Sequence, residues 1–169
     1  MKERVVNIRD ILTLYDYNYW ATRRILAASV QVSREQFLAP TAHSFASLRG
    51  TLVHTLDSEY GWRMLCQHQT LTADMDEDAF PSFDALEQRW NEEERTMRDY
   101  LARLSDDDLT DYVRYTTDSG QKRERLLWHC LLHVVNHGTQ HRSEAAAILT
   151  GYGHSPGDLD FTLFLNEQR

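Results

Sequence analysis

The residues with the clearest chemical meaning are four histidines at every fourth position: His129, His133, His137 and His141. In an α-helix a step of four residues turns the side-chain direction by only about 40°, so neighbours in this series point the same way. Such a pair can place two imidazole nitrogens on one metal ion. The direction drifts by about 120° over the whole series, so all four cannot share one ion. The spacing leaves open which neighbouring pair would bind it.

A third ligand has to come from another segment, and His54 is the candidate, because it lies in an apolar sector of a predicted helix. Three neutral imidazoles leave a coordination position for water or substrate, which is typical of a catalytic metal site. The alternative is a set of ordinary core or surface histidines. Burial of several imidazoles favours the metal, since one cation satisfies two or three of them. The loop histidines are interpreted as solvent-facing or capping residues; these are His43, His68 and His154.

The elements that must position these residues are long helices. The 169 residues include only 7 glycines and 3 prolines, so few positions break a helix. Apolar residues at helical spacing predict helices over about 7–29, from Ser44 or Ser47 to about 67, and over 83–104 and 124–150, with Gly151 just beyond the last one. Short helical turns are expected after Ser33 and Ser105 and near the C-terminus. Two glycines inside the second helix, Gly50 and Gly61, indicate close approach by another backbone or a ligand.

The segment 110–125 departs from helical spacing. Tyr112, Arg114 and Thr116 alternate with Val113 and Tyr115, and a turn signal follows at residues 118–120, so we expect a β-hairpin. The acidic stretch 68–82 is expected to be a loop. The sequence therefore predicts an all-α protein, one four-helix-bundle domain over residues 1–169, with a short hairpin before the last long helix.

Composition excludes several classes of partner. The chain carries 18 Lys and Arg against 26 Asp and Glu, a net charge of −8, which disfavours nucleic acid and anionic lipid surfaces. The two cysteines, Cys66 and Cys130, cannot form a disulfide framework and are interpreted as buried thiols. Without a signal peptide or a membrane-spanning run, we expect a cytoplasmic protein with no nucleic-acid or membrane partner.

Three segments in order resemble motifs of the DinB-like family, the damage-inducible superfamily of four-helix-bundle metal proteins. They are YNYWATRRIL (17–26), FASLRGTLVHTLDSEYGW (45–62) and LLHVVNHGTQHRSEAAAILTGYG (131–153). The resemblance covers nearly the whole chain. It implies a divalent metal bound by His54, His137 and His141, with His133 as a neighbour. Zn²⁺ and Ni²⁺ are the leading metals for three imidazoles, and Fe²⁺ or Mn²⁺ also fit.

The match has departures and open positions. Gln140 replaces the first histidine of a family pair, and Glu144 replaces a family glutamine. For Glu144 we consider pairing with Arg142 or a substrate cation, proton uptake near the site, or capping of the ion. Asp57 is a candidate acceptor for a ligand imidazole N–H, whereas Glu59 is expected to face elsewhere, toward an arginine. Three side chains of the first helix either line a cavity at the site or belong to the core; they are Tyr15, Asn18 and Tyr19.

Relatives in this superfamily include bacillithiol-dependent S-transferases and a mycothiol-dependent maleylpyruvate isomerase. The resemblance thus implies a metal-dependent enzyme that transfers a low-molecular-weight thiol to a small electrophile. A metal-dependent hydrolase and a non-enzymatic metal-binding stress-response protein are the alternatives. The resemblance also implies a homodimer. No organic cofactor is expected, and catalytic residues other than the metal ligands are not identifiable.

Overall fold

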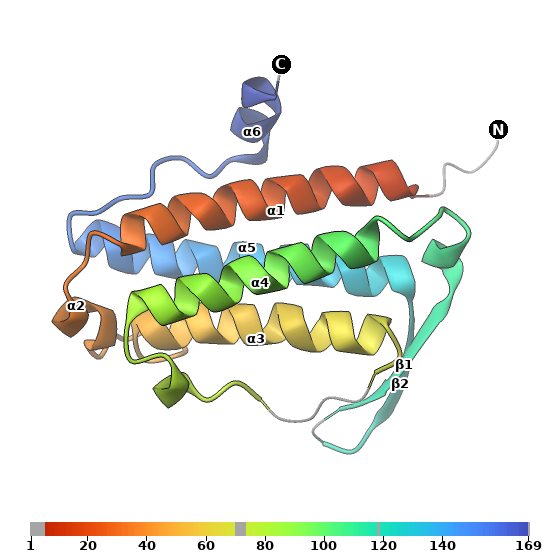
Figure 1. Cartoon of the computed structure of the whole chain (residues 1–169), viewed down its shortest axis with the longest axis horizontal. Coiled ribbons are helices and arrows are strands. Elements are labelled where there is room, and N and C mark those ends of the chain that lie inside the picture. The colour runs from red at the N-terminus through yellow and green to blue at the C-terminus, as the bar shows by residue number, and fades with distance from the viewer. Residues whose placement is uncertain (1–5, 70–73, 118, 169) are drawn as a thin grey trace.

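The computed structural model describes residues 6–69, 74–117 and 119–168 and shows a bundle of long helices (Figure 1). The long helices are α1 (Ile8–Ser29), α3 (Leu48–Cys66), α4 (Phe83–Leu101) and α5 (Leu127–Gly151). The short helices are α2 (Arg34–Leu38) and α6 (Phe161–Glu167), and 3₁₀ turns cover Glu77–Ala79 and Asp108–Thr110. The predicted all-α bundle is confirmed.

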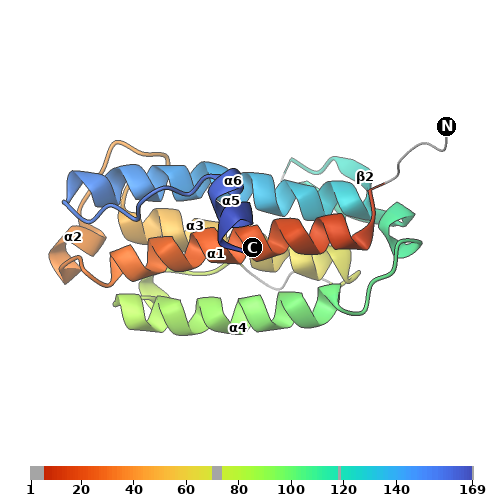
Figure 2. The ribbon, with the colours of Figure 1, turned by 90° about the horizontal axis from the view of Figure 1, so that it is seen from above.

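The long helices form a square in cross-section, with α1 diagonal to α3 and α4 diagonal to α5 (Figures 1 and 2). The most extensive packing is between α3 and α5 and between α1 and α5, while α4 packs on α3 and α1. Helices α1 and α5 run in one direction, and α3 and α4 run in the other. Because α3 and α5 are antiparallel neighbours, residues from the middle of each helix meet at one level of the bundle.

Local signals fix most helix starts. Asn7 with Asp10 and Ser33 with Gln36 form capping boxes at α1 and α2, and the Ser47 side chain accepts the Gly50 N–H at the start of α3. Ser82 precedes α4 as predicted, but its side chain makes no capping hydrogen bond. Helix α4 ends at Leu101, three residues before the predicted end.

The predicted hairpin is present, and it changes where the last long helix begins. Strands β1 (Tyr112–Thr116) and β2 (Lys122–Leu126) are antiparallel, with Tyr112 opposite Leu126. Since β2 occupies residues 124–126, α5 begins at Leu127 and not at Glu124. Its C-terminal end also differs, because Gly151 is still helical and the left-handed turn falls at Gly153, with φ of 84°. Of the predicted turn, Asp118 lies outside the described residues.

Helix α6 lies across the outside of α1 (Figure 2). Tyr17 of α1 packs edge-on against Phe161 and Phe164, and its hydroxyl donates to the Leu159 carbonyl at 2.9 Å. These contacts anchor the C-terminal segment to the bundle. Within the described part of the chain, none of the helices combines the length and apolarity needed to cross a bilayer.

Gly50 provides the close backbone approach that the sequence indicated. A Cβ atom at this position would overlap the carbonyl oxygen of Phe45, in the loop that leads into α3. The same loop contains Ala46 at φ 59°, a left-handed conformation that is uncommon for residues other than glycine. The missing side chain at Gly50 therefore lets the loop turn tightly over the first turn of α3.

Replacing Gly50 by alanine is expected to destabilise the fold by about 1–3 kcal/mol, because the added methyl group must displace a backbone carbonyl. Gly151→Ala is the matched control, since it also lies in a long helix but has open space around its Cβ position. That control should gain up to about 1 kcal/mol from helix propensity. Urea unfolding of the two variants measures the difference. Stabilisation of both would contradict the steric role of Gly50.

Candidate metal centre

Three histidines meet between α3 and α5. The Nε2 atom of His137 lies 3.2 Å from Nε2 of His54 and 3.2 Å from Nε2 of His141. One ring nitrogen from each histidine lies within 4.8 Å of the other two. Two nitrogens that bind one ion at about 2.1 Å are roughly 3.0–3.4 Å apart at octahedral or tetrahedral angles. The cluster therefore has the spacing and the donor type that a transition-metal ion requires.

Glu144 determines which way one of these rings presents its lone pair. Its Oε2 atom accepts a hydrogen bond of 2.8 Å from Nδ1 of His141, and its Oε1 atom accepts one of 3.3 Å from the Ser44 hydroxyl. With the proton held on Nδ1, the lone pair of Nε2 faces the other two rings. Glu144 therefore contacts the ring nitrogen of His141 opposite the one that approaches His137.

The third ring is held by an aromatic contact. Phe45 stacks on His54 with ring centroids 3.7 Å apart and an interplanar angle of 14°, and it also meets His141 edge-on at 5.2 Å. Phe45 reaches this position through the loop that passes over Gly50. The sequence-based reasoning gave Phe45 no role, although it lies within the second family-like segment. Phe45 and Glu144 thus orient two of the three rings.

Electrostatics keep two of the three rings, His54 and His137, in their neutral form. Partial burial and the neighbouring His141 lower the pKa of His54 to about 4. Burial, followed by the charges of His141 and His54, lowers the pKa of His137 to about 4 as well. Near neutral pH both rings are therefore unprotonated and have lone pairs available for a cation.

A buried polar network supports the cluster from the centre of the bundle. Glu59 of α3 accepts hydrogen bonds from the Tyr19 hydroxyl at 2.5 Å and the Asn18 amide at 3.1 Å. The guanidinium of Arg142, the residue after His141, donates to the Asn18 carbonyl oxygen. Burial raises the pKa of Glu59 to about 7. This network connects α1, α3 and α5, and it shows that Glu59 points into the core toward α1.

Asp57 has a different role from the one predicted. Its Oδ1 atom accepts the backbone N–H of Met75 at 2.9 Å, so it anchors the segment after α3 and does not support an imidazole. Tyr15 and Tyr19 are core residues, with 1% and 0% of their surface exposed. Asn18 belongs to the buried network. Asp57 points about 60° away from His54 around the axis of α3. Its carboxylate therefore contacts the segment after α3 and not the imidazole.

The remaining histidines lie outside the cluster. His133 packs against Trp62 at 4.8 Å and against His137 at 5.6 Å between ring centroids, which agrees with its expected place as a neighbour. His129 is one turn further toward the start of α5. Three others lie in loops; they are His43, His68 and His154. His68 has φ of 56° and follows the C-terminal end of α3 directly.

The two cysteines are buried free thiols. Cys66 of α3 is 4% exposed and Cys130 of α5 is 1% exposed. The interaction between the two thiols raises the pKa of Cys66 and lowers that of Cys130. Neither thiol belongs to the histidine cluster.

The arrangement defines a class of protein: a helical bundle with a candidate three-histidine metal centre between two antiparallel helices. The family comparison is more specific, because the model of the DinB family matches residues 1–169. The chain belongs to the DinB family. It is 28% identical over 166 residues to Protein DinB of Bacillus subtilis (strain 168), with 91% of this chain and 94% of that protein covered.

A solved structure has the same fold. The crystal structure of a DinB-like protein from Bacillus cereus ATCC 10987 superimposes with a TM-score of 0.71 and covers 92% of this chain and 99% of that one. Sequence identity is 13%, so this likeness concerns the architecture alone. Together with the family match, it confirms the DinB-like bundle that the three sequence segments indicated.

In metal-free protein, the ring protons of His54 and His137 are expected to titrate near pH 4, because burial and neighbouring rings disfavour the charged forms. Ordinary histidines titrate near pH 6.5. Two-dimensional NMR of the imidazole protons measures the midpoints, and His54→Gln and His137→Gln assign the signals. Midpoints near 6.5 for both rings would contradict the lowered pKa values.

Proposed function

We propose that the protein is a metal-dependent thiol S-transferase that acts on small electrophiles, with His54, His137 and His141 binding the ion. The observation that carries this proposal is the approach of three Nε2 atoms, with 3.2 Å between neighbouring pairs. The DinB family match supports a metal-binding role. Zn²⁺ and Ni²⁺ are the leading metals, and Fe²⁺ or Mn²⁺ would also suit three imidazoles.

Two features of the site support a reaction in preference to a purely structural ion. In the described part of the chain the cluster has only three members, so it supplies fewer ligands than the four of a closed structural zinc site. His54 and His137 are also only partly buried, which allows a small molecule to approach. Glu144 is engaged by His141 and Ser44, and it does not take a fourth position.

The chemistry divides between the ion and the protein. A bound divalent ion supplies a Lewis acid that lowers the pKa of a coordinated thiol toward neutral pH. The protein holds the His54 and His137 rings neutral, and Glu144 keeps the His141 proton on Nδ1. In the transfer a sulfur–carbon bond forms, the bond from that carbon to its leaving group breaks, and the leaving group departs with the electron pair. The thiol proton passes to solvent.

Protein grown with ample metal is expected to contain about one divalent ion per chain, measured by elemental analysis. His137→Ala should lower this ratio strongly, whereas His129→Ala, on the same helix but two turns away, should keep it. Glu144→Ala should weaken metal affinity by about 10- to 100-fold, because it removes the side-chain acceptor that orients His141. Equal losses for His137→Ala and His129→Ala would refute the proposed ligand set.

Metal-loaded protein is expected to accelerate the reaction of a low-molecular-weight thiol with a chromogenic electrophile such as 1-chloro-2,4-dinitrobenzene. Cysteine, glutathione and bacillithiol are the thiols to compare. Activity should fall at least 100-fold in His137→Ala and stay unchanged in His154→Ala, which alters a loop histidine outside the cluster. Full metal content without acceleration for any thiol would reject the transferase and leave the metal site standing.

A further inference from the structure

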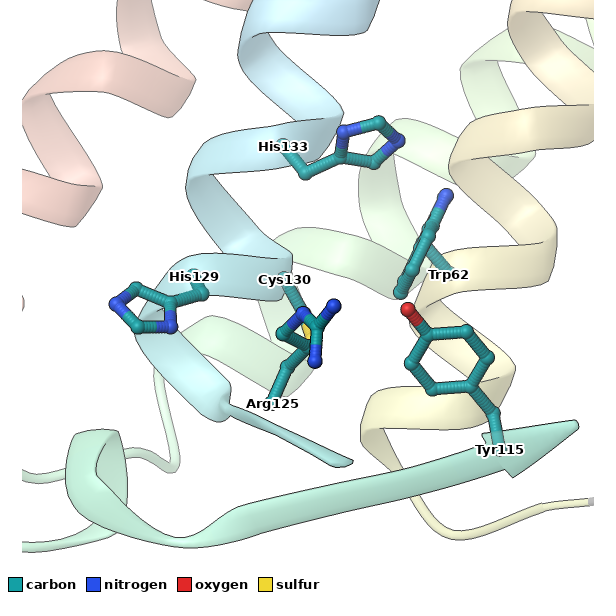
Figure 3. A pocket seen from close by; sticks show the side chains of 6 residues that line it. All are labelled: Trp62, Tyr115, Arg125, His129, Cys130 and His133. Carbon is teal, nitrogen blue, oxygen red and sulfur yellow. The ribbon is translucent and has the colours of Figure 1, made fainter. Parts of the chain in front are cut away.

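A second feature with ligand-binding chemistry lies beside the histidine cluster, where the hairpin meets α3 and α5 (Figure 3). This hairpin cavity has a volume of about 330 Å³. Its lining residues come from four elements and are Trp62, Tyr115, Arg125, His129, Cys130 and His133. The volume lies within the range of small-molecule sites, roughly 300–1,000 Å³.

The hairpin register explains how these residues come together. Val113 is opposite Arg125, and Tyr115 is two residues further along the same strand, so all three project from one face of the ribbon. Val113 is 1% exposed, which identifies this face as the one packed on the bundle. Tyr115 and Arg125 consequently face the cavity, on the side away from Arg114.

Aromatic contacts build one wall of the cavity. The ring of Trp62 is fixed between Tyr115, at 5.2 Å, and His133, at 4.8 Å, both in edge-on geometry (Figure 3). An indole offers a flat, rigid surface for a planar unsaturated or aromatic group. The Tyr115 hydroxyl adds a hydrogen-bonding group to the same wall.

The charge of the cavity selects the sign of its ligand. Arg125 is its permanently charged residue, and among the residues that the structure describes no carboxylate lines the cavity. The Arg125 guanidinium donates to the Glu124 backbone carbonyl at 2.8 Å, which leaves other N–H groups for a ligand. The hairpin strands also carry several basic residues around one acidic residue, Glu124; they are Arg114, Lys122, Arg123 and Arg125. In a chain of net charge −8, this is a local region that attracts anions.

The cavity adjoins the candidate metal centre through one residue. His133 touches Trp62 in the cavity wall, and its ring centroid is 5.6 Å from that of His137 in the cluster. A ligand in the cavity therefore lies about one helical turn of α5 from the three histidines. This position suits a pocket that selects which molecule is presented to the metal.

We infer that the hairpin cavity binds a small organic anion with a planar, unsaturated body. Arg125 binds its carboxylate, Trp62 packs against the planar body, and the Tyr115 hydroxyl provides a further hydrogen bond. The inference that the cavity binds an anion is argued from the cavity residues alone and does not depend on the metal centre. Only its use as the specificity pocket rests on the proposed function.

Calorimetric titration of the full-length, metal-free protein with 2-naphthoate tests the binding without a contribution from an ion. Neutral 2-naphthamide is the matched probe, since it keeps the ring system and loses the charge. We expect 2-naphthoate to bind at least about fivefold more tightly than the amide. Arg125→Gln should weaken 2-naphthoate binding by about tenfold and leave the amide unchanged, because one charge-assisted contact is removed.

Arg114→Gln is the control, because it removes the same charge from the opposite face of the hairpin. It should change 2-naphthoate affinity by less than about twofold. Trp62→Leu, checked for folding by circular dichroism, should weaken both probes by removing the planar wall. Equal affinity for the two probes, equal effects of Arg125→Gln and Arg114→Gln, or the absence of measurable binding would overturn the inference.

Repeating the titration with metal-loaded protein separates this site from the metal centre. If 2-naphthoate bound only to metal-loaded protein, and Arg125→Gln left its affinity unchanged, its carboxylate would be bound by the ion. That result would refute the hairpin cavity as the binding site. Binding to metal-free protein that depends on Arg125 supports the cavity even when the transferase assays fail. The two proposals can therefore fail independently.

Discussion

The close approach of three imidazole nitrogens is the interaction on which the candidate site depends, and the packing around it holds the rings in this arrangement. Hydrogen bonding to Glu144 leaves Nε2 of His141 as an acceptor, and the lowered pKa values of His54 and His137 keep those rings uncharged. Lone pairs 3.2 Å apart repel unless a proton or a cation lies between them. A neutral imidazole still carries one N–H, so an N–H···N hydrogen bond relieves the contact of one pair of rings, whereas the proposed metal ion would satisfy all three nitrogens at once.

The surrounding bundle holds these rings in place at several levels. Phe45 stacks on His54. The loop that contains Phe45 packs closely against Gly50, which has no side chain to block it. On the core side, the network of Glu59, Asn18 and Arg142 connects the helices next to the histidines. Removing one member of such a buried network leaves the others without partners, which makes the network sensitive to single changes.

The architecture could be predicted from the sequence because its signals are local. Helical spacing of apolar residues, the scarcity of glycine and proline, and the alternation around Val113 each depend on a few neighbouring positions. The start of α5 was misplaced because residues 124–126 suit a helix locally but pair with β1 in the folded chain. Tertiary pairing therefore overrides a local preference at this boundary.

The site was less accessible to sequence reasoning. Spacing along α5 narrowed the ligands to neighbouring pairs, and only the family resemblance selected His137 and His141. The contacts of the Asp57 and Glu59 side chains depend on which helices surround α3. A projection of α3 alone does not show where those neighbouring helices lie. The hairpin cavity was missed entirely, since Trp62, Tyr115 and Arg125 are distant in the chain and form no recognisable motif. Only the alternation that places Tyr115 on the inward face of the hairpin was a usable signal.

The separation of the histidines along the chain also bears on when the proposed metal could be bound. His54 and His137 are 83 residues apart, and α5 is the last of the long helices to leave the ribosome. A nascent chain presents His54 long before its two partners emerge, so it cannot offer the full set of ligands during most of synthesis. The proposed metal would therefore be bound with its full set of ligands only after α5 has emerged and packed against α3.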